Sequence, residues 1–155
     1  MVHADSSTFA SGLSKAEVYT QVLEQAQGLF ESQRNWVCNL ANASSLLYHG
    51  LLSLPRPSSA VNWCKVACQT IAFGRGVCGT AAKEVKTQLV PNVDAFPGHI
   101  ACDSASKSEI VVPIIQNGKT VAIIDIDCAE LEGFDEEDKE YLEKFSELIS
   151  KSSDF

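Results

Sequence analysis

The chain has 155 residues, 21% of them charged, and its formal net charge is −8. This length is typical of one domain, and an excess of acidic over basic residues is unfavourable for binding phosphates, so we expect no nucleic-acid partner. No apolar run approaches the roughly 20 residues that cross a bilayer, and the N-terminus lacks a secretory signal. We therefore expect a cytoplasmic protein that does not bind a membrane.

Six cysteines occur along the chain. Because the reducing cytoplasm keeps thiols open, they indicate metal ligands, redox chemistry or small buried side chains rather than structural disulfides. Free cysteine is often simply buried, and for Cys38 we favour such a role in the core.

The first predicted elements are helices. Residues 1–13 are polar and small, and we expect a flexible N-terminal arm there. Ser14 and Glu17 have the spacing of a capping box, and apolar residues at helical spacing predict a helix over 14–31. A second apolar stripe predicts a helix that ends near Pro55 and includes Trp36, Leu40, Ala43, Leu47 and Leu51.

The middle of the chain is less regular. Residues 60–64 have the character of a strand, but they run without a turn signal into the segment that holds Cys68. Gly74 and Gly76 indicate a turn, because glycine adopts backbone angles that other residues avoid. A short helix over 77–86 and a brief strand over 88–90 follow.

Two β-rich runs, 109–115 and 119–127, are joined by Asn117-Gly118, which is the strongest short signal for a hairpin. Pro113 lacks an amide hydrogen and favours an edge or bulge position. Asp135 is the predicted N-cap of a last helix, after which we expect the C-terminal tail to fray. This order of elements indicates an α+β fold with helices packed on an antiparallel sheet.

The segment 68–109 is the candidate for a thiol active site, because it holds Cys68, Cys78 and Cys102 and most of the glycines. Cys78 lies near a predicted helix N-terminus, where the helix dipole should lower the pKa of its thiol. Cys102 is bounded by turn residues, and we expect it to be exposed. Both cysteines are candidate nucleophiles.

Acidic residues form a second candidate site. Asp125 and Asp127 alternate with isoleucines, so their side chains should share one face of a strand. If that strand pairs with the one beginning at Glu109, three carboxylates meet, bind an ammonium group and raise one carboxyl pKa. The alternative is a solvated polar face, although aspartate is disfavoured in strands.

A zinc site is the competing interpretation of the cysteines. Cys64, Cys68, His99 and Cys102 are ligands of an acceptable type. No compact Cys-x2-Cys pair occurs, however, and we predict no metal.

Several motifs resemble those of the GAF-domain free methionine-(R)-sulfoxide reductases. They are Val61-Asn-Trp63, Gly74-Arg-Gly-Val-Cys-Gly79, Phe96-Pro-Gly-His-Ile-Ala-Cys-Asp103, Ser108-Glu-Ile-Val-Val-Pro113 and Asp125-Ile-Asp127. The resemblance covers the chain from Ser14 onward. It implies a single GAF domain over 14–155, an α+β, GAF-like fold with a central antiparallel sheet flanked by helices.

The resemblance also implies the chemistry. Cys102 is similar to the cysteine that attacks the sulfoxide, Cys68 to the resolving cysteine, and Cys78 to a third cysteine of the disulfide relay. No cofactor would be bound, and thioredoxin would be the external reductant. Trp63 would contact the methyl group of the substrate, and the substrate's polar groups would be bound by Glu109, Asp125 and Asp127.

One feature departs from this family. Cys64 runs directly into Lys65, where the family has a further hairpin, so a segment is expected to be missing between residues 64 and 65. The alternatives are a mobile segment at this position or a shortened chain, and we favour the first, because loss of a hairpin would expose sheet edges. A non-catalytic GAF sensor that binds a small molecule is the alternative function, and a homodimer is left open.

Overall fold

The computed structural model describes residues 9–10, 12–54, 70–102 and 104–155. The chain divides into two compact units, one formed by Met1–Arg56 with Glu147–Phe155 and the other by Pro57–Ser146. The predicted strand at 60–64, most of the N-terminal arm, and the residues Trp63, Cys64 and Cys68 lie outside the described residues.

The first unit begins with helix α1 (Lys15–Phe30), whose predicted cap is confirmed. The Ser14 hydroxyl accepts a hydrogen bond from the Glu17 amide at 3.3 Å, and the Glu17 carboxylate accepts one from the Ser14 amide at 2.8 Å. Helix α2 (Trp36–Ser53) starts after Asn35, whose side-chain oxygen accepts from two amides of the first turn. Both helix starts therefore have capped amides.

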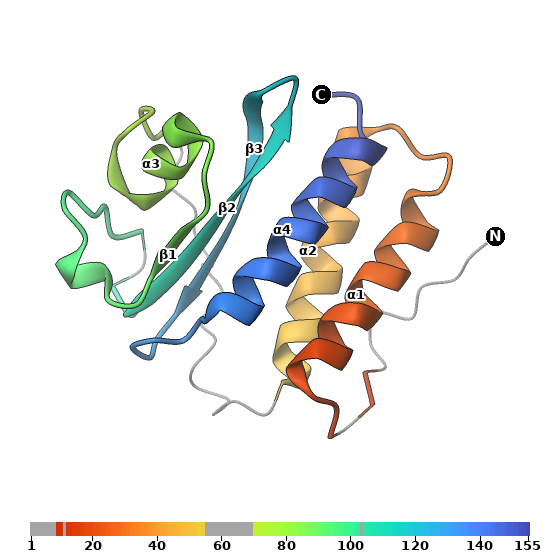
Figure 1. Cartoon of the computed structure of the whole chain (residues 1–155), viewed down its shortest axis with the longest axis horizontal. Helices are drawn as coiled ribbons and strands as arrows, with labels where there is room; N and C mark the ends of the chain where they lie inside the picture. The colour runs from red at the N-terminus through yellow and green to blue at the C-terminus, as the bar shows by residue number, and fades with distance from the viewer. Residues whose placement is uncertain (1–8, 11, 55–69, 103) are drawn as a thin grey trace. The chain divides into compact units, whose positions relative to one another are not determined.

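Helices α1 and α2 run side by side (Figure 1). Their close approach depends on Gly50, where an added Cβ would lie 2.6 Å from Cγ2 of Val22 on α1. Val22 is β-branched and has little rotamer freedom in a helix, so it cannot easily move aside. A glycine in the middle of α2 is thus explained by packing, although glycine weakens a helix.

The prediction of which residues of α2 face the core is wrong at the first turn of the helix. Trp36 is 46% exposed, and Cys38 is exposed instead of filling the core. Asn39 is fully buried in their place, and Ala43, Leu47 and Leu51 are buried as predicted. Trp36 stacks on Phe155 with ring centroids 6.1 Å apart, which explains an aromatic residue on the outer face.

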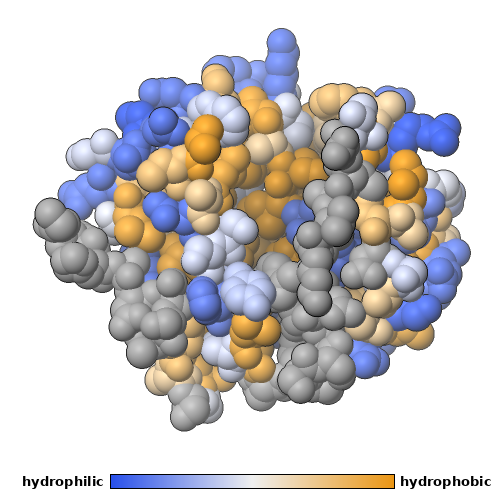
Figure 2. Space-filling view, turned by 180° about the vertical axis from the view of Figure 1, so that it is seen from behind, coloured by the Kyte–Doolittle hydropathy of each residue, from blue (hydrophilic) through white to orange (hydrophobic). Residues whose placement is uncertain are grey.

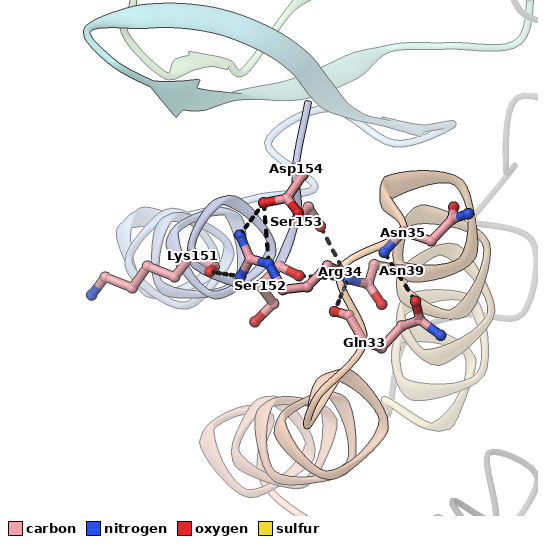
Figure 3. Close-up of polar contacts among 8 residues, drawn as sticks. All are labelled: Gln33, Arg34, Asn35, Asn39, Lys151, Ser152, Ser153 and Asp154. Carbon is pink, nitrogen blue, oxygen red and sulfur yellow. Dashed lines mark hydrogen bonds and ion pairs between the residues drawn. The ribbon is translucent and has the colours of Figure 1, made fainter.

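The C-terminal tail does not fray as predicted (Figure 3). The Arg34 side chain donates to the Asp154 carboxylate at 3.1 Å and to the Lys151 carbonyl at 2.6 Å. The buried amide of Asn39 donates to the Ser152 carbonyl at 2.9 Å. The sequence pattern could not indicate this, because the partners are more than a hundred residues apart.

Within the described part of the second unit, three strands form an antiparallel sheet in the order β1-β2-β3. They are β1 (Gln88–Val90), β2 (Ser108–Gln116) and β3 (Lys119–Cys128), with the 3-10 turn η1 (Val93–Ala95) after β1. The predicted hairpin is confirmed: Asn117 and Gly118 join β2 to β3 with φ values of 52° and 73°. Helix α3 (Gly76–Glu84) packs against all three strands (Figure 1).

Pro113 lies on the central strand β2, not on an edge strand. Strand β1, however, pairs with β2 only as far as Val111, so Pro113 lies beyond that ladder. The register also shifts between Ile114 and Ile115, immediately after the proline. A missing amide hydrogen is tolerated at this position because β1 does not reach it.

Helix α4 (Glu136–Ser152) passes from the second unit into the first. The predicted cap is confirmed, since the Asp135 side chain accepts from the amides of Glu137 and Asp138 at 3.0 and 3.1 Å. Within the second unit, the Ser146 hydroxyl donates to the Pro113 carbonyl at 2.7 Å. The part of α4 in this unit is therefore held against β2, and the α+β fold is confirmed.

Among the described residues, no helix is long and apolar enough to cross a membrane. Some large apolar side chains are nevertheless exposed, including Phe73 at 67% and Leu131 at 57%. Figure 2 shows hydrophobic and hydrophilic residues interspersed on the face that it presents.

Candidate active site

Strand pairing brings the predicted carboxylates together. Glu109 lies opposite Asp127 in the β2–β3 ladder, and Asp125 lies opposite Val111, two residues further along β2. Glu109 and Asp127 are 5% and 6% exposed, whereas Asp125 lies on the solvent side of the group. The prediction that three carboxylates meet on one face of the sheet is confirmed.

Helix α3 places Cys78 against these acids. The Cys78 thiol donates a hydrogen bond to Oδ2 of Asp125 at 3.0 Å and lies 3.7 Å from Oε1 of Glu109. The helix start is held close to the preceding turn at Gly79, where a Cβ would lie 2.4 Å from the Ala72 carbonyl oxygen. The glycine therefore permits the backbone approach that aims Cys78 at the sheet.

The predicted low pKa of Cys78 is wrong. Burial raises the pKa of the thiol far above its ordinary value, and the negative charges of Asp125 and Glu109 raise it further. The helix dipole favours a thiolate, but two carboxylates within hydrogen-bond distance oppose it more strongly. Cys78 is therefore a neutral hydrogen-bond donor in this arrangement.

The sequence predicts that one carboxyl group of the acidic cluster has a raised pKa, and this group is Glu109. Burial raises its pKa to about 9, with further contributions from the charges of Asp125 and Asp127 and from a hydrogen bond with Asp125. Glu109 is consequently protonated at neutral pH. A buried carboxylic acid that keeps its proton at this pH is suited to general acid catalysis.

Asp125 and His99 complete the surroundings of Glu109. Desolvation raises the pKa of Asp125, while hydrogen bonds from Cys78 and Glu109 lower it. The His99 ring lies beside Glu109, with Nε2 at 3.7 Å from Oε2 of Glu109.

We expect the stability of the protein to depend on pH through Glu109. Its pKa rises from 4.5 to about 9 on folding, so the folded state binds the extra proton between these values. The free energy of unfolding should therefore fall as pH rises across this window, by at most about 1.4 kcal/mol per pH unit for one proton. Urea titrations at several pH values measure this slope.

Glu109→Gln should flatten that dependence, because glutamine does not titrate. Glu24→Gln, which changes an exposed residue of α1, is the control and should retain the wild-type slope. Equal slopes for wild type and Glu109→Gln would contradict the assignment of the raised pKa to Glu109.

Cys102 lies beside this cluster and is disulfide-bonded. Cys38, Cys78 and Cys128 form no disulfide. The described residues that line the cavity next to the disulfide include Arg75, Cys78, Cys102 and the three acids. The cavity has a volume of about 10 Å³, which is room for about one water molecule, so the disulfide form holds no amino-acid-sized ligand there.

Only one group of side chains in the described ranges is compact enough to suggest a metal site. The Cys78 sulfur and oxygens of Glu109 and Asp125 lie within 4.8 Å of one another. Their protons and mutual hydrogen bonds already account for this closeness. The predicted absence of a metal remains a prediction, and two of the four cysteine and histidine residues weighed as zinc ligands lie outside the described residues.

The structure also adds residues that were not singled out from the sequence. Arg75, in the Gly-Arg-Gly turn, and Ile100 line the cavity. His99, which was weighed from the sequence only as a zinc ligand, lies beside Glu109 instead. The only signal for Arg75 was its position as a cation between two glycines and just before Cys78. Trp63 and Cys68 lie outside the described residues.

The family model of the GAF domain matches residues 15–152. This range includes the sheet and helix α3, which carries Cys78 against the acidic side chains. A free methionine-R-sulfoxide reductase of Saccharomyces cerevisiae is 51% identical, with 99% of this chain and 95% of that protein covered. A solved GAF domain matches with a TM-score of 0.92 at 50% identity, covering 100% of this chain and 98% of that one.

A third relative links the fold to a ligand. The structure of the free methionine-R-sulfoxide reductase of Neisseria meningitidis, in complex with its substrate, matches with a TM-score of 0.81 at 33% identity. The match covers 94% of this chain and 95% of that one. The chain therefore belongs to the free methionine-R-sulfoxide reductase family of GAF-domain proteins.

The alignment with the yeast relative runs over 174 positions, although this chain has 155 residues. The relative therefore has positions that have no counterpart in this chain. The position expected for a missing segment, between residues 64 and 65, lies outside the described residues.

Proposed function

We propose that this protein reduces free methionine-(R)-sulfoxide to methionine by thiol chemistry in the cytoplasm. The observation that supports it most strongly is the disulfide-bonded Cys102 beside a buried, protonated Glu109 in one cavity. A redox-active cysteine next to a proton donor is what reduction of a sulfoxide requires.

In the first step the Cys102 thiolate attacks the sulfoxide sulfur, and Glu109 protonates the sulfoxide oxygen. The sulfur–oxygen bond breaks, methionine leaves, and the oxygen remains on Cys102 as a sulfenic acid. Cys78 is the less suitable nucleophile, because burial and the neighbouring carboxylates raise the pKa of its thiol. Its thiol instead donates a hydrogen bond to Asp125.

In the second step the thiol of Cys68 attacks the sulfenic acid, which releases water and forms a disulfide with Cys102. The other cysteines of the described residues form no disulfide, which supports a partner for Cys102 elsewhere in the chain. Thioredoxin then reduces the disulfide by thiol exchange and is itself oxidised. Cys78 can enter this relay after Cys68. No bound cofactor is needed.

The proposal also accounts for selection of the free amino acid. A free substrate carries an ammonium group that is absent from a methionine sulfoxide residue within a peptide. Asp125 and Asp127 would bind this ammonium group, and Trp63 would contact the terminal methyl group. Burying an acidic cluster without a cation is unfavourable, so the ammonium compensates charge as well as fixing orientation.

The test is reduction of the two epimers of free methionine sulfoxide by the purified protein with thioredoxin, thioredoxin reductase and NADPH. We expect NADPH consumption with the R epimer and a much lower rate with the S epimer or with the sulfoxide in a blocked peptide. Binding of the R epimer without NADPH consumption would favour the alternative, a GAF sensor without catalysis.

A further inference from the structure

His99 is a largely buried titratable group that the proposed mechanism does not use. Its Nε2 atom lies 3.7 Å from Oε2 of Glu109, and the two side chains are 15% and 6% exposed. The turn before it is well defined, since Gly98 adopts a φ of 72°, which favours glycine, and the His99 amide donates to the Phe96 carbonyl at 3.1 Å. The fold thus places an imidazole against a buried carboxyl group.

Among the described residues, the other titratable groups that face Glu109 are acidic. Asp127 lies opposite it on β3, Asp125 shares a hydrogen bond with it, and the Cys78 thiol of α3 lies 3.7 Å from its Oε1. Loss of the Glu109 proton therefore adds a negative charge to a desolvated acidic cluster, which is unfavourable unless a cation lies nearby. His99 can supply that cation, at the carboxyl oxygen that Cys78 does not contact.

The charge of His99 already acts on this cluster. Desolvation raises the pKa of Asp125, while hydrogen bonds with Cys78 and Glu109 and the charge of His99 lower it. Glu109 and Arg75 line the cavity, whereas His99 is not among the described residues that do. His99 therefore acts on the acids from outside the cavity rather than by contact with a ligand.

We propose that His99 is a positioning residue that stabilises the carboxylate which Glu109 becomes when it protonates the sulfoxide oxygen. This inference rests on the proposed function, in which Glu109 is the general acid. Negative charge develops on Glu109 in the transition state, and an imidazolium 3.7 Å away attracts it. Because groups at this distance titrate together, His99 takes up a proton as Glu109 loses one.

The protons of the step balance. The Cys102 thiol loses a proton to water and His99 takes one from water, so that a thiolate and an imidazolium form together. The proton of Glu109 goes to the sulfoxide oxygen, which remains on Cys102 as the sulfenic acid when methionine leaves. His99 then returns its proton to Glu109, and both groups regain their starting forms.

The first test needs no turnover and follows the Glu109 carboxyl by ¹³C NMR of protein labelled at its glutamate side chains. The signal that is absent from Glu109→Gln identifies Glu109, and its titration midpoint in the wild type should lie at about pH 9. His99→Gln has a similar size but takes up no charge, so it should lower the acid dissociation constant of Glu109 about 10-fold. His99→Lys restores a positive charge and should bring the midpoint back to the wild-type value or below it.

His49→Gln is the matched control, because it removes an imidazole that contacts Tyr48 on α2 and does not line the cavity. It should leave the titration of Glu109 unchanged.

The second test measures the rate of methionine formation in a single turnover at neutral pH. His99→Gln should slow this rate roughly 3–10-fold, because a weaker acid transfers its proton more slowly. The dissociation constant of the substrate should stay nearly unchanged, and His99→Lys should recover part of the rate. Replacement of a residue that only fills space would not produce this recovery.

The outcomes separate this inference from the proposed function. An unchanged midpoint in His99→Gln would overturn it, as would a shifted midpoint with a wild-type single-turnover rate. If the midpoint shifts but the wild type does not reduce the sulfoxide, the pairing of His99 with Glu109 stands and the proposed reaction fails. If circular dichroism shows that His99→Gln is unfolded, His99→Lys decides, and a midpoint above the wild-type value would then overturn the assignment.

Discussion

Cys102→Ser is expected to abolish formation of methionine from free methionine-(R)-sulfoxide. Serine has nearly the same shape, but its hydroxyl is not ionised at neutral pH and does not attack the sulfoxide sulfur. Loss of a nucleophile lowers rates by roughly 10⁴-fold or more in enzymes where it has been measured. The effect should therefore be complete in a single-turnover experiment.

The measurement uses fully reduced protein mixed with substrate in the absence of an external reductant, followed by quantification of methionine. Wild-type protein should form at least one methionine for each active site, because one sulfenic acid forms per cycle and transfer of the disulfide to Cys78 would free the Cys102 thiol again. Cys38→Ser is the matched control, since Cys38 is exposed on α2 and forms no disulfide. It should give the wild-type yield.

Circular dichroism of the reduced wild type and the reduced Cys102→Ser variant checks that both proteins are folded alike. An unchanged yield of methionine from Cys102→Ser would remove Cys102 as the attacking group. Cys78 would then be the next candidate, despite its buried position among acids.

The second large effect is expected from Glu109→Gln. Glutamine preserves the size of the side chain and can still donate a hydrogen bond, but it has no proton to transfer to the departing oxygen. General acids contribute about 10²–10⁴-fold to a rate, so kcat should fall by roughly that factor. KM should change much less, because Asp125 and Asp127 remain to bind the ammonium.

The pH dependence gives an independent check. In the wild type the rate should fall as pH rises above about 9, where Glu109 loses its proton. Glu109→Gln should lack this alkaline loss, and Glu24→Gln should keep it. An equal kcat in Glu109→Gln and wild type would assign the acid to another group, such as His99, whose ring contacts Glu109.

Much of the local structure was predictable because it depends on neighbours in the sequence. Capping at Ser14 and Asp135 and the turn at Asn117-Gly118 each involve residues within four positions of one another. The meeting of Glu109 with Asp127 was also predictable, since a tight hairpin determines which residues of two strands face each other. The sequence alone therefore determined the helices, the hairpin and the acidic face.

Other features depend on contacts between distant segments. The burial of Asn39, rather than of Trp36 or Cys38, depends on the C-terminal residues, because the Asn39 amide donates to the Ser152 carbonyl. A helical stripe does not reveal which residue at its end is covered by a distant segment.

The site shows the same division. From the sequence, Cys78 was a thiol at a helix N-terminus and a candidate of low pKa. Only the tertiary structure places that thiol within 3.0 Å of Asp125 and buries it, so that electrostatic repulsion and desolvation reverse the direction of the pKa shift. The sequence by itself thus determined which groups the protein has for its chemistry. The packing of α3 on the sheet decided which of them is protonated, because burial and charge depend on neighbours that are far apart along the chain.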